Sequence, residues 1–412
     1  MSRAQDGADA EGSLVRAATE SEHNSVRGSG RDRSDSSHRA DASSRKRLVR
    51  FVALIQSILI LAHLFLYETW TFSPKGPGAS GALGGKFALG LMSVSFIAAS
   101  LLAFRYANAA VRALYTASAI WLGLLNFLLF AAVGSWIVFG IGRLAGLDLN
   151  FHRILEILSG IAIVFGSYGV VNASWTRITR ATVRLPNLPR AWRGRKAALI
   201  SDLHLGHVRN SGFLHRTVAQ ILKEKPDAVF IAGDLFDGTA VDARQAAEPL
   251  QRLAASHGVY FVAGNHEQFG NDSRYLNAVA AVGVRVLSNE KVEVDGLQIL
   301  GVPYRNATQR GHLASALHAI GLDRDRASIL LIHAPDYPEI AEAAGVSLQL
   351  SGHTHLGQFV PWTWLVRRFY RQFAYGLSRI GKMHVFTSSG AGTWGPPLRL
   401  GSKAEIVILE FQ

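Results

Sequence analysis

Cysteine is absent from the 412-residue chain. Its absence excludes disulfide bonds and metal sites built from thiolates. A metal ion would have to be held by histidine, aspartate or asparagine, and the chain has 15 histidines. Acidic residues are also in the minority, since 30 Asp and Glu stand against 43 Lys and Arg, which gives a formal net charge of +13. This balance favours phosphorylated substrates, anionic lipids or nucleic acid as partners.

The excess positive charge is concentrated in two parts of the sequence that contain no acidic residue. Residues 173–196 contain seven Lys and Arg, and residues 356–402 contain six. A basic surface that faces anionic lipid head groups explains this concentration better than a diffuse nucleic-acid surface does. We therefore expect membrane contact, and nucleic acid is not expected as a partner.

Residues 1–47 lack apolar periodicity and are rich in Ser, Arg, Asp, Gly and Ala. We expect a disordered tail here. Residues 48–174 then predict a transmembrane region with four helices. Each apolar segment approaches or exceeds the ~18–20 residues that a helix needs to cross a bilayer. The segments cover 51–72, 87–104, 113–141 and 154–174. The third is long, which favours a tilted or kinked helix over two separate ones.

The basic residues around these segments predict the topology. Arg45, Lys46, Arg47 and Arg50 precede the first segment and place the N-terminus in the cytoplasm. Four crossings return the chain to the same side, so the region after the helices is expected in the cytoplasm too. Three or five crossings would reverse this orientation.

Residues 175–196 are expected to form a basic linker, because the stretch 185–189 carries two prolines that interrupt helices and strand ladders. From residue 197 to residue 412 the pattern changes to short apolar runs that alternate with amphipathic stretches. This alternation predicts an α/β domain with stacked sheets flanked by helices. Expected strands cover 197–201, 228–232, 259–263, 297–302, 329–332, 348–350, 384–388 and 405–411, and expected helices include 213–224 and 243–256.

Polar residues directly follow several of these expected strands. Taken alone, each motif has an ordinary structural explanation, such as a surface turn or a helix N-cap. Ligands in α/β folds collect outside the carboxyl ends of strands, so all of these side chains would meet at one edge. Imidazole, carboxylate and amide groups in this order predict a metal site. The motifs are Asp202-Leu203-His204, Gly233-Asp234-Leu235-Phe236-Asp237, Gly264-Asn265-His266-Glu267, His333 and Gly352-His353-Thr354-His355.

The set resembles the calcineurin-like metallophosphoesterase superfamily, whose blocks are D-x-H, G-D-x-x-D, G-N-H-[DE], H and G-H-x-H. The resemblance covers residues 197–412 and implies a double β-sheet sandwich with two divalent metal ions, commonly manganese, iron or zinc. It implies that one metal is held by Asp202, His204 and His355, and the other by Asn265, His333 and His353. Asp234 would bridge the two metals and take part in catalysis.

The resemblance also assigns roles beside the metals. His266 would be catalytic rather than a ligand, acting on the leaving group or on the charge of the transition state. Asp237 would orient a ligand. Two cations can bind phosphate oxygens and offset negative charge during an in-line displacement at phosphorus.

Within the superfamily the chain is most similar to a membrane-associated branch of bacterial phosphodiesterases, some of which act on phosphate-bearing lipids. That branch has a G-H-T-H-G-G-Q block, which reads Gly-His-Thr-His-Leu-Gly-Gln over 352–358 here, and a late G-x-G-T-W-G-P-P-x-R block at 390–399. The departure is Leu356, where glycine is usual. The resemblance implies an integral protein of the bacterial inner or plasma membrane.

We therefore expect a phosphodiesterase or pyrophosphatase that acts on a lipid-linked or membrane-proximal phosphate. A phosphatase for soluble phosphomonoesters and a catalytically inert metal-binding membrane scaffold remain alternatives. Residues 359–375 interleave aromatic residues with arginines. They predict either a lip that enters the lipid interface or an ordinary core helix with a solvated basic face.

Overall fold

The structure is a computed structural model that describes residues 46–72, 83–268 and 272–412. Almost all of the expected disordered tail, residues 1–47, lies outside the described residues. By its internal contacts the chain divides into Met1–Ala62 and His63–Gln412. The described part of the first unit is helical and belongs to the helix Lys46–Thr71. All further contacts described below lie within His63–Gln412.

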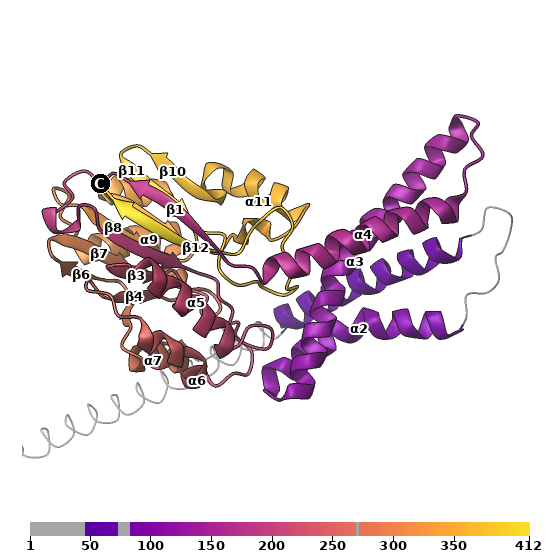
Figure 1. Cartoon of the computed structure of the whole chain (residues 1–412), viewed down its shortest axis with the longest axis horizontal. Helices are drawn as coiled ribbons and strands as arrows, with labels where there is room; N and C mark the ends of the chain where they lie inside the picture. Colours follow the sequence, from indigo (N-terminus) through magenta and orange to yellow (C-terminus); the bar gives the residue numbers. More distant parts are fainter. Residues whose placement is uncertain (1–45, 73–82, 269–271) are drawn as a thin grey trace, which may run out of the picture. The chain divides into compact units, whose positions relative to one another are not determined.

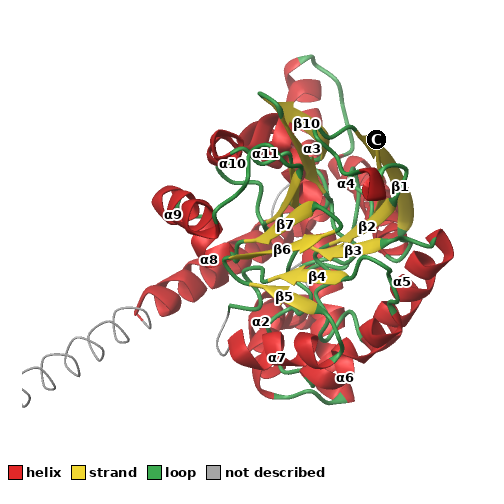
Figure 2. Ribbon diagram, turned by 90° about the vertical axis from the view of Figure 1, so that its left-hand side faces the viewer, coloured by secondary structure: helices red, strands yellow, loops and turns green. Residues whose placement is uncertain are grey.

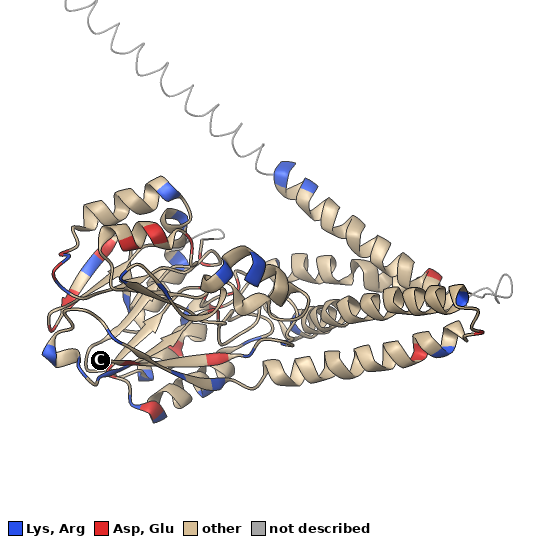
Figure 3. Cartoon of the chain, turned by 90° about the horizontal axis from the view of Figure 1, so that it is seen from above, with Lys and Arg blue, Asp and Glu red and all other residues tan. Residues whose placement is uncertain are grey.

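Four helices of the described part are long and apolar enough to cross a membrane, as the sequence predicts. They are Lys46–Thr71, α2 (Leu83–Arg105), α3 (Ala109–Leu144) and α4 (Phe151–Ala173). The third apolar segment forms one helix, and the side chains of Asn108 and Asn150 cap the N-termini of α3 and α4. α3 and α4 run side by side, and charged residues are rare along the helices and frequent in the rest of the chain (Figures 1 and 3).

The remainder of the chain forms two six-stranded sheets, which confirms the predicted double-sheet sandwich. In sheet order, the first sheet contains β1 (Arg177–Val183), β12 (Glu405–Phe411), β2 (Lys196–Ile200), β3 (Ala228–Ile231), β4 (Val259–Val262) and β5 (Arg285–Leu287). The second contains β10 (Gly376–Ile380), β11 (Met383–Thr387), β9 (Leu348–Ser351), β8 (Ser328–Leu331), β7 (Leu297–Gly301) and β6 (Glu290–Val294).

The strands that precede the motifs run parallel to one another within each sheet. β2, β3, β4 and β5 are parallel neighbours, and so are β7, β8, β9 and β11. Their central members are buried along their whole length, as expected for parallel strands that are covered on both faces. Leu199, Phe230, Leu331 and Leu350 belong to the core between the two sheets.

Helices cover the outer face of each sheet (Figure 2). α5 (Ser211–Glu224), α6 (Ala243–Ala247) and α7 (Asp272–Ala281) share a core with the first sheet. α9 (Arg310–Ile320) and α10 (Pro338–Ala344) share a core with the second, while α8 (Tyr304–Ala307) and α11 (Trp362–Tyr370) follow β7 and β9. Short 3-10 turns are η1 (Arg190–Trp192), η2 (Glu248–Arg252), η3 (His355–Gly357) and η4 (Arg371–Ala374). The helix expected over 243–256 is shorter, because Pro249 opens the 3-10 turn η2.

Residues 175–196, which were expected to form a linker, contain strand β1 and the turn η1 of the folded domain. β1 pairs in parallel with β12, and Trp192 is fully buried against Phe411. The proline-containing stretch lies between β1 and η1. β1 was not predicted, because its partner β12 is more than two hundred residues away along the chain. The domain limits 1–47, 48–174, 175–196 and 197–412 stay predictions.

The expected lipid-facing basic surface is smaller than the sequence suggests. Arg180 and Arg195 form ion pairs with Glu224 and Asp227, at 2.8 and 2.9 Å. Arg399 is fully buried. Arg399 is therefore withdrawn from the surface, whereas the charges of Arg180 and Arg195 stay exposed and are partly offset by their acidic partners.

Candidate metal centre

The predicted site residues lie where the carboxyl ends of the two sheets meet. Asp202, Asp234 and Asn265 follow β2, β3 and β4 of the first sheet. His333 follows β8 and the pair His353 and His355 follows β9 of the second sheet. Parallel strands end at one edge, so residues that are up to 153 positions apart, from Asp202 to His355, become neighbours.

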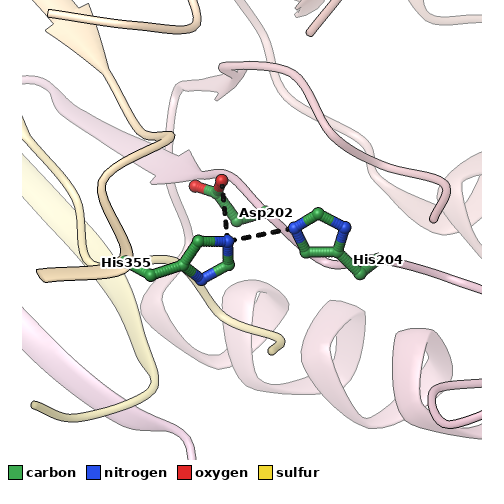
Figure 4. A group of neighbouring side chains, drawn as sticks. All are labelled: Asp202, His204 and His355. Carbon is green, nitrogen blue, oxygen red and sulfur yellow. Dashed lines mark hydrogen bonds and ion pairs between the residues drawn. The ribbon is translucent and has the colours of Figure 1, made fainter. Parts of the chain in front are cut away.

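One group consists of Asp202, His204 and His355 (Figure 4). Nε2 of His355 lies 3.0 Å from Nε2 of His204 and 3.4 Å from Oδ1 of Asp202. The backbone N–H of His353 donates to the carboxylate of Asp202 at 3.1 Å and holds it in place. The three side chains therefore converge on one point.

A second group consists of Asp234, His333 and His353. Nε2 of His333 lies 3.1 Å from Oδ2 of Asp234 and 3.2 Å from Nδ1 of His353. The amide oxygen of Asn265 lies 3.1 Å from the same Nδ1. The structure thus brings the four residues that the resemblance assigns to a second metal and its bridge into one cluster.

The two groups are continuous. Nε2 of His204 lies 3.8 Å from Oδ2 of Asp234, and His204, Asp234 and His266 form a third group with ligand atoms close enough for one ion. The backbone N–H of His266 donates to Oδ1 of Asp234 at 2.9 Å, and its Nδ1 lies 2.8 Å from the carbonyl oxygen of Asp237. Asp234 consequently lies between the groups, as a bridging ligand would.

The backbone at these positions is unusual. Asp202, His204, Asp234, His353 and His355 all have positive φ, between 47° and 69°. L-residues rarely adopt this region, and such strain collects at functional sites. Here it occurs in the loops that follow β2, β3 and β9, which carry the candidate ligands.

Two glycines of the motifs are required by close packing. A Cβ added to Gly264 would collide with Oδ1 of Asp234, and one added to Gly352 would collide with Oδ2 of Asp202. Gly264 therefore leaves room for a carboxylate that follows the neighbouring strand β3, and Gly352 leaves room for one that follows β2 of the other sheet. Any larger residue at these two positions would displace a candidate ligand.

The ionisable groups of the cluster shift the pKa values of one another. Burial would lower the pKa of His333, but Asp234 and Asp202 reverse this and raise it to about 10. His333 in turn holds the pKa of the buried Asp234 carboxyl well below its usual range. Burial and the charge of His333 lower the pKa of His353 to about 4, and burial lowers the pKa of His204 and His355. The carboxylates thus favour positive charge at the centre.

These residues fit divalent metal ions. The donors are carboxylate, imidazole and amide atoms, which suit zinc, iron and manganese. Imidazole nitrogens of His204 and His355 face each other at 3.0 Å, a position suited to a shared cation. Nδ1 of His333 contacts the carbonyl oxygen of Ala232 at 2.7 Å, the outer contact that fixes a ligating imidazole.

Comparison with known proteins gives the same assignment. Residues 195–357 match the family model described as calcineurin-like phosphoesterase. An uncharacterized metallophosphoesterase of Campylobacter jejuni is 30% identical over 64% of this chain and 72% of its own length. The chain belongs to the calcineurin-like metallophosphoesterase family. Its members are metal-dependent phosphoester hydrolases, and the clustered His and Asp groups could bind the metal.

Two further metallophosphoesterases match this chain over most of their own length. A zebrafish (Danio rerio) protein named as a transmembrane protein with metallophosphoesterase domain is 28% identical over 90% of this chain and 91% of its own length. An uncharacterized metallophosphoesterase of Aquifex aeolicus is 31% identical over 61% of this chain and 98% of its own. The zebrafish match extends into the helical region, which supports membrane association of this metallophosphoesterase.

Glu267 is the last residue of the Gly-Asn-His-Glu motif, and no role was predicted for it. Its buried carboxylate accepts hydrogen bonds from the backbone N–H groups of Asp234, Phe236 and Gly264, at 3.0, 3.0 and 2.8 Å. Burial and the charge of Asp234 raise its pKa to about 7. Glu267 therefore fastens the loop after β3 to the loop after β4. An acid at the fourth position of the motif was the signal for this role.

Arg399 was also missed as a residue of the site. Its guanidinium donates to the carbonyl oxygens of Ser389 and Gly392, both at 2.7 Å, and lies 3.4 Å from Nδ1 of His355. Its own backbone N–H donates to Gly169 of α4 at 2.9 Å, and Asn172 of α4 donates to its carbonyl oxygen at 2.9 Å. Arg399 thus lies between a candidate metal ligand and a membrane helix.

Proposed function

We propose that this metallophosphoesterase is a phosphodiesterase or pyrophosphatase with two divalent metal ions, acting on a lipid-linked or membrane-proximal phosphate. The observation that carries the activity is the convergence of all seven predicted ligands at one sheet edge. The ligands are Asp202, His204, Asp234, Asn265, His333, His353 and His355. An inert scaffold would not need a complete set of donors.

Asp202, His204 and His355 would hold one ion, Asn265, His333 and His353 the other, and Asp234 both. When bound, the ions supply charge neutralisation for phosphate oxygens and lower the pKa of coordinated water. Asparagine contributes a neutral oxygen, which limits the negative charge that faces an anionic substrate.

His266 is the proposed acid for the leaving group. Support comes from its fixed position, since its N–H bonds to Asp234 and its Nδ1 contacts the carbonyl oxygen of Asp237. Its ring lies 4.7 Å from the ring of His204, so it borders the metal cluster from the side of the first sheet. The chain's own contribution is then to hold an imidazole beside the scissile bond.

The membrane-proximal substrate is supported by α11. Trp364 is 69% exposed and Phe369 is 78% exposed, so this helix does not bury its aromatic side chains in the core. The segment before it rests on α3, where Asn126 donates to the carbonyl oxygen of Val360 at 3.3 Å and Phe127 contacts Phe359. An exposed aromatic helix with arginines, joined to a membrane helix, suits the lipid interface.

The side of the membrane is likewise a proposal. Basic residues before the first helix and after α4 favour the cytoplasm for both the N-terminus and the catalytic domain of a bacterial inner-membrane protein. The chain lacks cysteine, so one engineered cysteine at exposed Leu377 would report the side directly. In intact cells it should resist a membrane-impermeant thiol reagent and react after permeabilisation. Labelling in intact cells would place the domain outside.

The activity is tested by hydrolysis of bis(p-nitrophenyl) phosphate and p-nitrophenyl phosphate by the full-length protein in detergent. Cleavage of the diester should require Mn²⁺ or another divalent ion and exceed that of the monoester. Asp234→Asn should abolish turnover. His266→Gln should lower kcat about 100-fold or more while bound metal stays constant. Monoester preference would favour the soluble-phosphatase alternative, and stoichiometric metal without cleavage of either ester would favour the scaffold.

The lipid part of the proposal needs a separate comparison. Trp364→Ser and Phe369→Ser should raise the KM for a phosphodiester embedded in vesicles and leave hydrolysis of soluble bis(p-nitrophenyl) phosphate nearly unchanged. Leu377→Ser is the matched control, because Leu377 is an exposed apolar residue on β10 rather than on α11. Equal losses with both substrates would contradict a lipid-facing role for α11.

A further inference from the structure

A pocket of about 440 Å³ lies beside the metal cluster but contains none of its candidate ligands. One side is formed by the junction of α2 and α3, with Ala107 and Arg112. The other side is formed by the loop after β2, with Gly206, Arg209 and Ser211. The same loop begins with Asp202 and His204. The pocket therefore separates the ends of two membrane helices from a loop that carries candidate metal ligands.

Arg209 is the decisive residue of this pocket, because its charge is buried without a counter-charge. It is only 8% exposed, and no ion pair of Arg209 occurs among the described residues. Its Nη2 donates to the carbonyl oxygen of Ala173 at 2.6 Å, while its buried Nε has no hydrogen-bond partner in the described part of the chain. Burial, helped by the charge of Arg216, lowers its pKa to about 10, so it remains charged at neutral pH.

Arg399 is also buried, and its charge has partners that Arg209 lacks. The guanidinium of Arg399 donates from all three of its nitrogens, and two nearby carboxylates, Asp202 and Glu405, stabilise its charge. Among the described residues, no carboxylate raises the pKa of Arg209 in this way. The guanidinium of Arg209 lies over the ring of Phe213, 4.9 Å from the ring centroid, and bonds to the carbonyl oxygen of Ala173, but neither contact neutralises its charge. A buried cation without a counter-ion is costly, since much of its hydration is lost. A bound anion would supply the missing charge.

Two further features of the pocket favour an anion. Arg112 is exposed near the start of α3 and adds a second positive charge. The 14-residue helix α5 begins at Ser211, which lines the pocket. The side chain of Asn210 already caps the N–H of Phe213, and the positive end of the helix dipole borders the pocket. Asp242 lines the pocket too, but its carboxylate accepts the N–H groups of Arg244 and Gln245 as the N-cap of α6.

We propose that this pocket is an anion-binding site for a phosphate group, carried by a phospholipid head group or by a small soluble molecule. Arg209 and Arg112 hold the phosphate, and the N-terminus of α5 completes the site. An occupied pocket joins the loop that bears His204 to the ends of α2 and α3. The proposal does not depend on the activity of the metal centre.

The test measures phosphate binding by the full-length protein after EDTA treatment, so that metal ions contribute nothing. Isothermal titration with inorganic phosphate should give a dissociation constant that rises about tenfold or more in Arg112→Gln and Arg209→Gln, through loss of a charge-assisted hydrogen bond. Arg252→Gln is the control, because it removes the same charge from an exposed residue outside the pocket. Arg112→Gln keeps the test decisive if the buried Arg209 proves necessary for folding.

A second arm identifies the source of the phosphate. Native mass spectrometry of the protein from nanodiscs with and without phosphatidic acid should show one retained lipid that is lost in Arg112→Gln and kept in Arg252→Gln. Retained lipid without binding of inorganic phosphate assigns the site to a lipid head group, and the reverse assigns it to a soluble anion. The proposal is overturned if neither binds, or if Arg112→Gln binds both like the unmodified protein.

Discussion

Backbone conformation at single residues decides where the candidate ligands point. Five of them adopt positive φ directly after a strand, a conformation that the side chains of aspartate and histidine tolerate at some cost. Leu356, which follows His355, has a φ of 49° and is 4% exposed. The glycine that is usual at this position would adopt the same conformation without strain. Leucine accepts the strain and buries a large side chain.

Leu356→Gly should destabilise the protein by about 1–3 kcal/mol, because loss of the buried side chain (about 2–5 kcal/mol) exceeds the relief of a left-handed conformation (about 1–2 kcal/mol). Leu356→Ala should be less stable than Leu356→Gly, since alanine keeps most of the strain and also loses the side chain. Denaturant unfolding of the three proteins in one detergent checks the order. An alanine variant more stable than the glycine variant would contradict the left-handed conformation.

The loops after β3 and β4 act as one element because Glu267 joins them. Three backbone N–H groups converge on its carboxylate, and one of them belongs to Asp234, the proposed bridge. A carboxylate can accept all three hydrogen bonds, whereas the side-chain amide of glutamine has a single acceptor oxygen. The position of Asp234 therefore depends on both carboxylate oxygens of Glu267 and not only on the shape of the side chain.

Glu267→Gln should lower the free energy of unfolding by about 1–3 kcal/mol, because at least one buried N–H loses its acceptor. Turnover of the diester should also fall, since Asp234 is no longer held. Glu248→Gln serves as the control, because the side chain of Glu248 is 54% exposed. Thermal unfolding and kcat of both variants give the comparison. Unchanged values for Glu267→Gln would mean that the loops hold their positions without it.

At the scale of the molecule, the membrane helices form part of the packing of the catalytic domain. Phe127 and Ala131 of α3 share a small core with Phe359 and Leu398. Gly169 of α4 permits this contact, because a Cβ there would lie 2.8 Å from Cγ of Leu398. Hydrogen bonds from Arg209 to Ala173 and from Asn172 to Arg399 extend the contact toward the metal cluster. The helices thus support the site in addition to anchoring it.

A chain that begins at residue 175 should therefore be less stable and less active than the full-length protein. Removal of α3 and α4 exposes Phe359 and Leu398 and leaves the backbone of Arg399 without its helix partners. Thermal unfolding and hydrolysis of soluble bis(p-nitrophenyl) phosphate, with both proteins in the same detergent, check this. Equal melting temperatures and equal kcat would show that the helices serve only as an anchor.

The sequence by itself determined which side chains could form the candidate site and which four described helices are apolar enough to cross a membrane. Hydropathy is a local property, so the four spans are visible in the order of the residues. The motif residues are visible as well, because five such motifs follow apolar strands in one order, although each alone has an ordinary structural explanation. His204 and His355 could be named as partners only through their resemblance to a known family, not through any local signal.

The tertiary structure decided everything that depends on residues distant in sequence. β1 joins the domain because β12 lies beside it, and Arg399 reaches His355 because the late loop folds back over α4. Whether the aromatic side chains of α11 are buried or exposed depends on what packs against the helix. The periodicity of the sequence does not reveal this. The unpaired charge of Arg209 is also a tertiary property, since an arginine becomes an unsatisfied cation only when folding removes water and brings no acid.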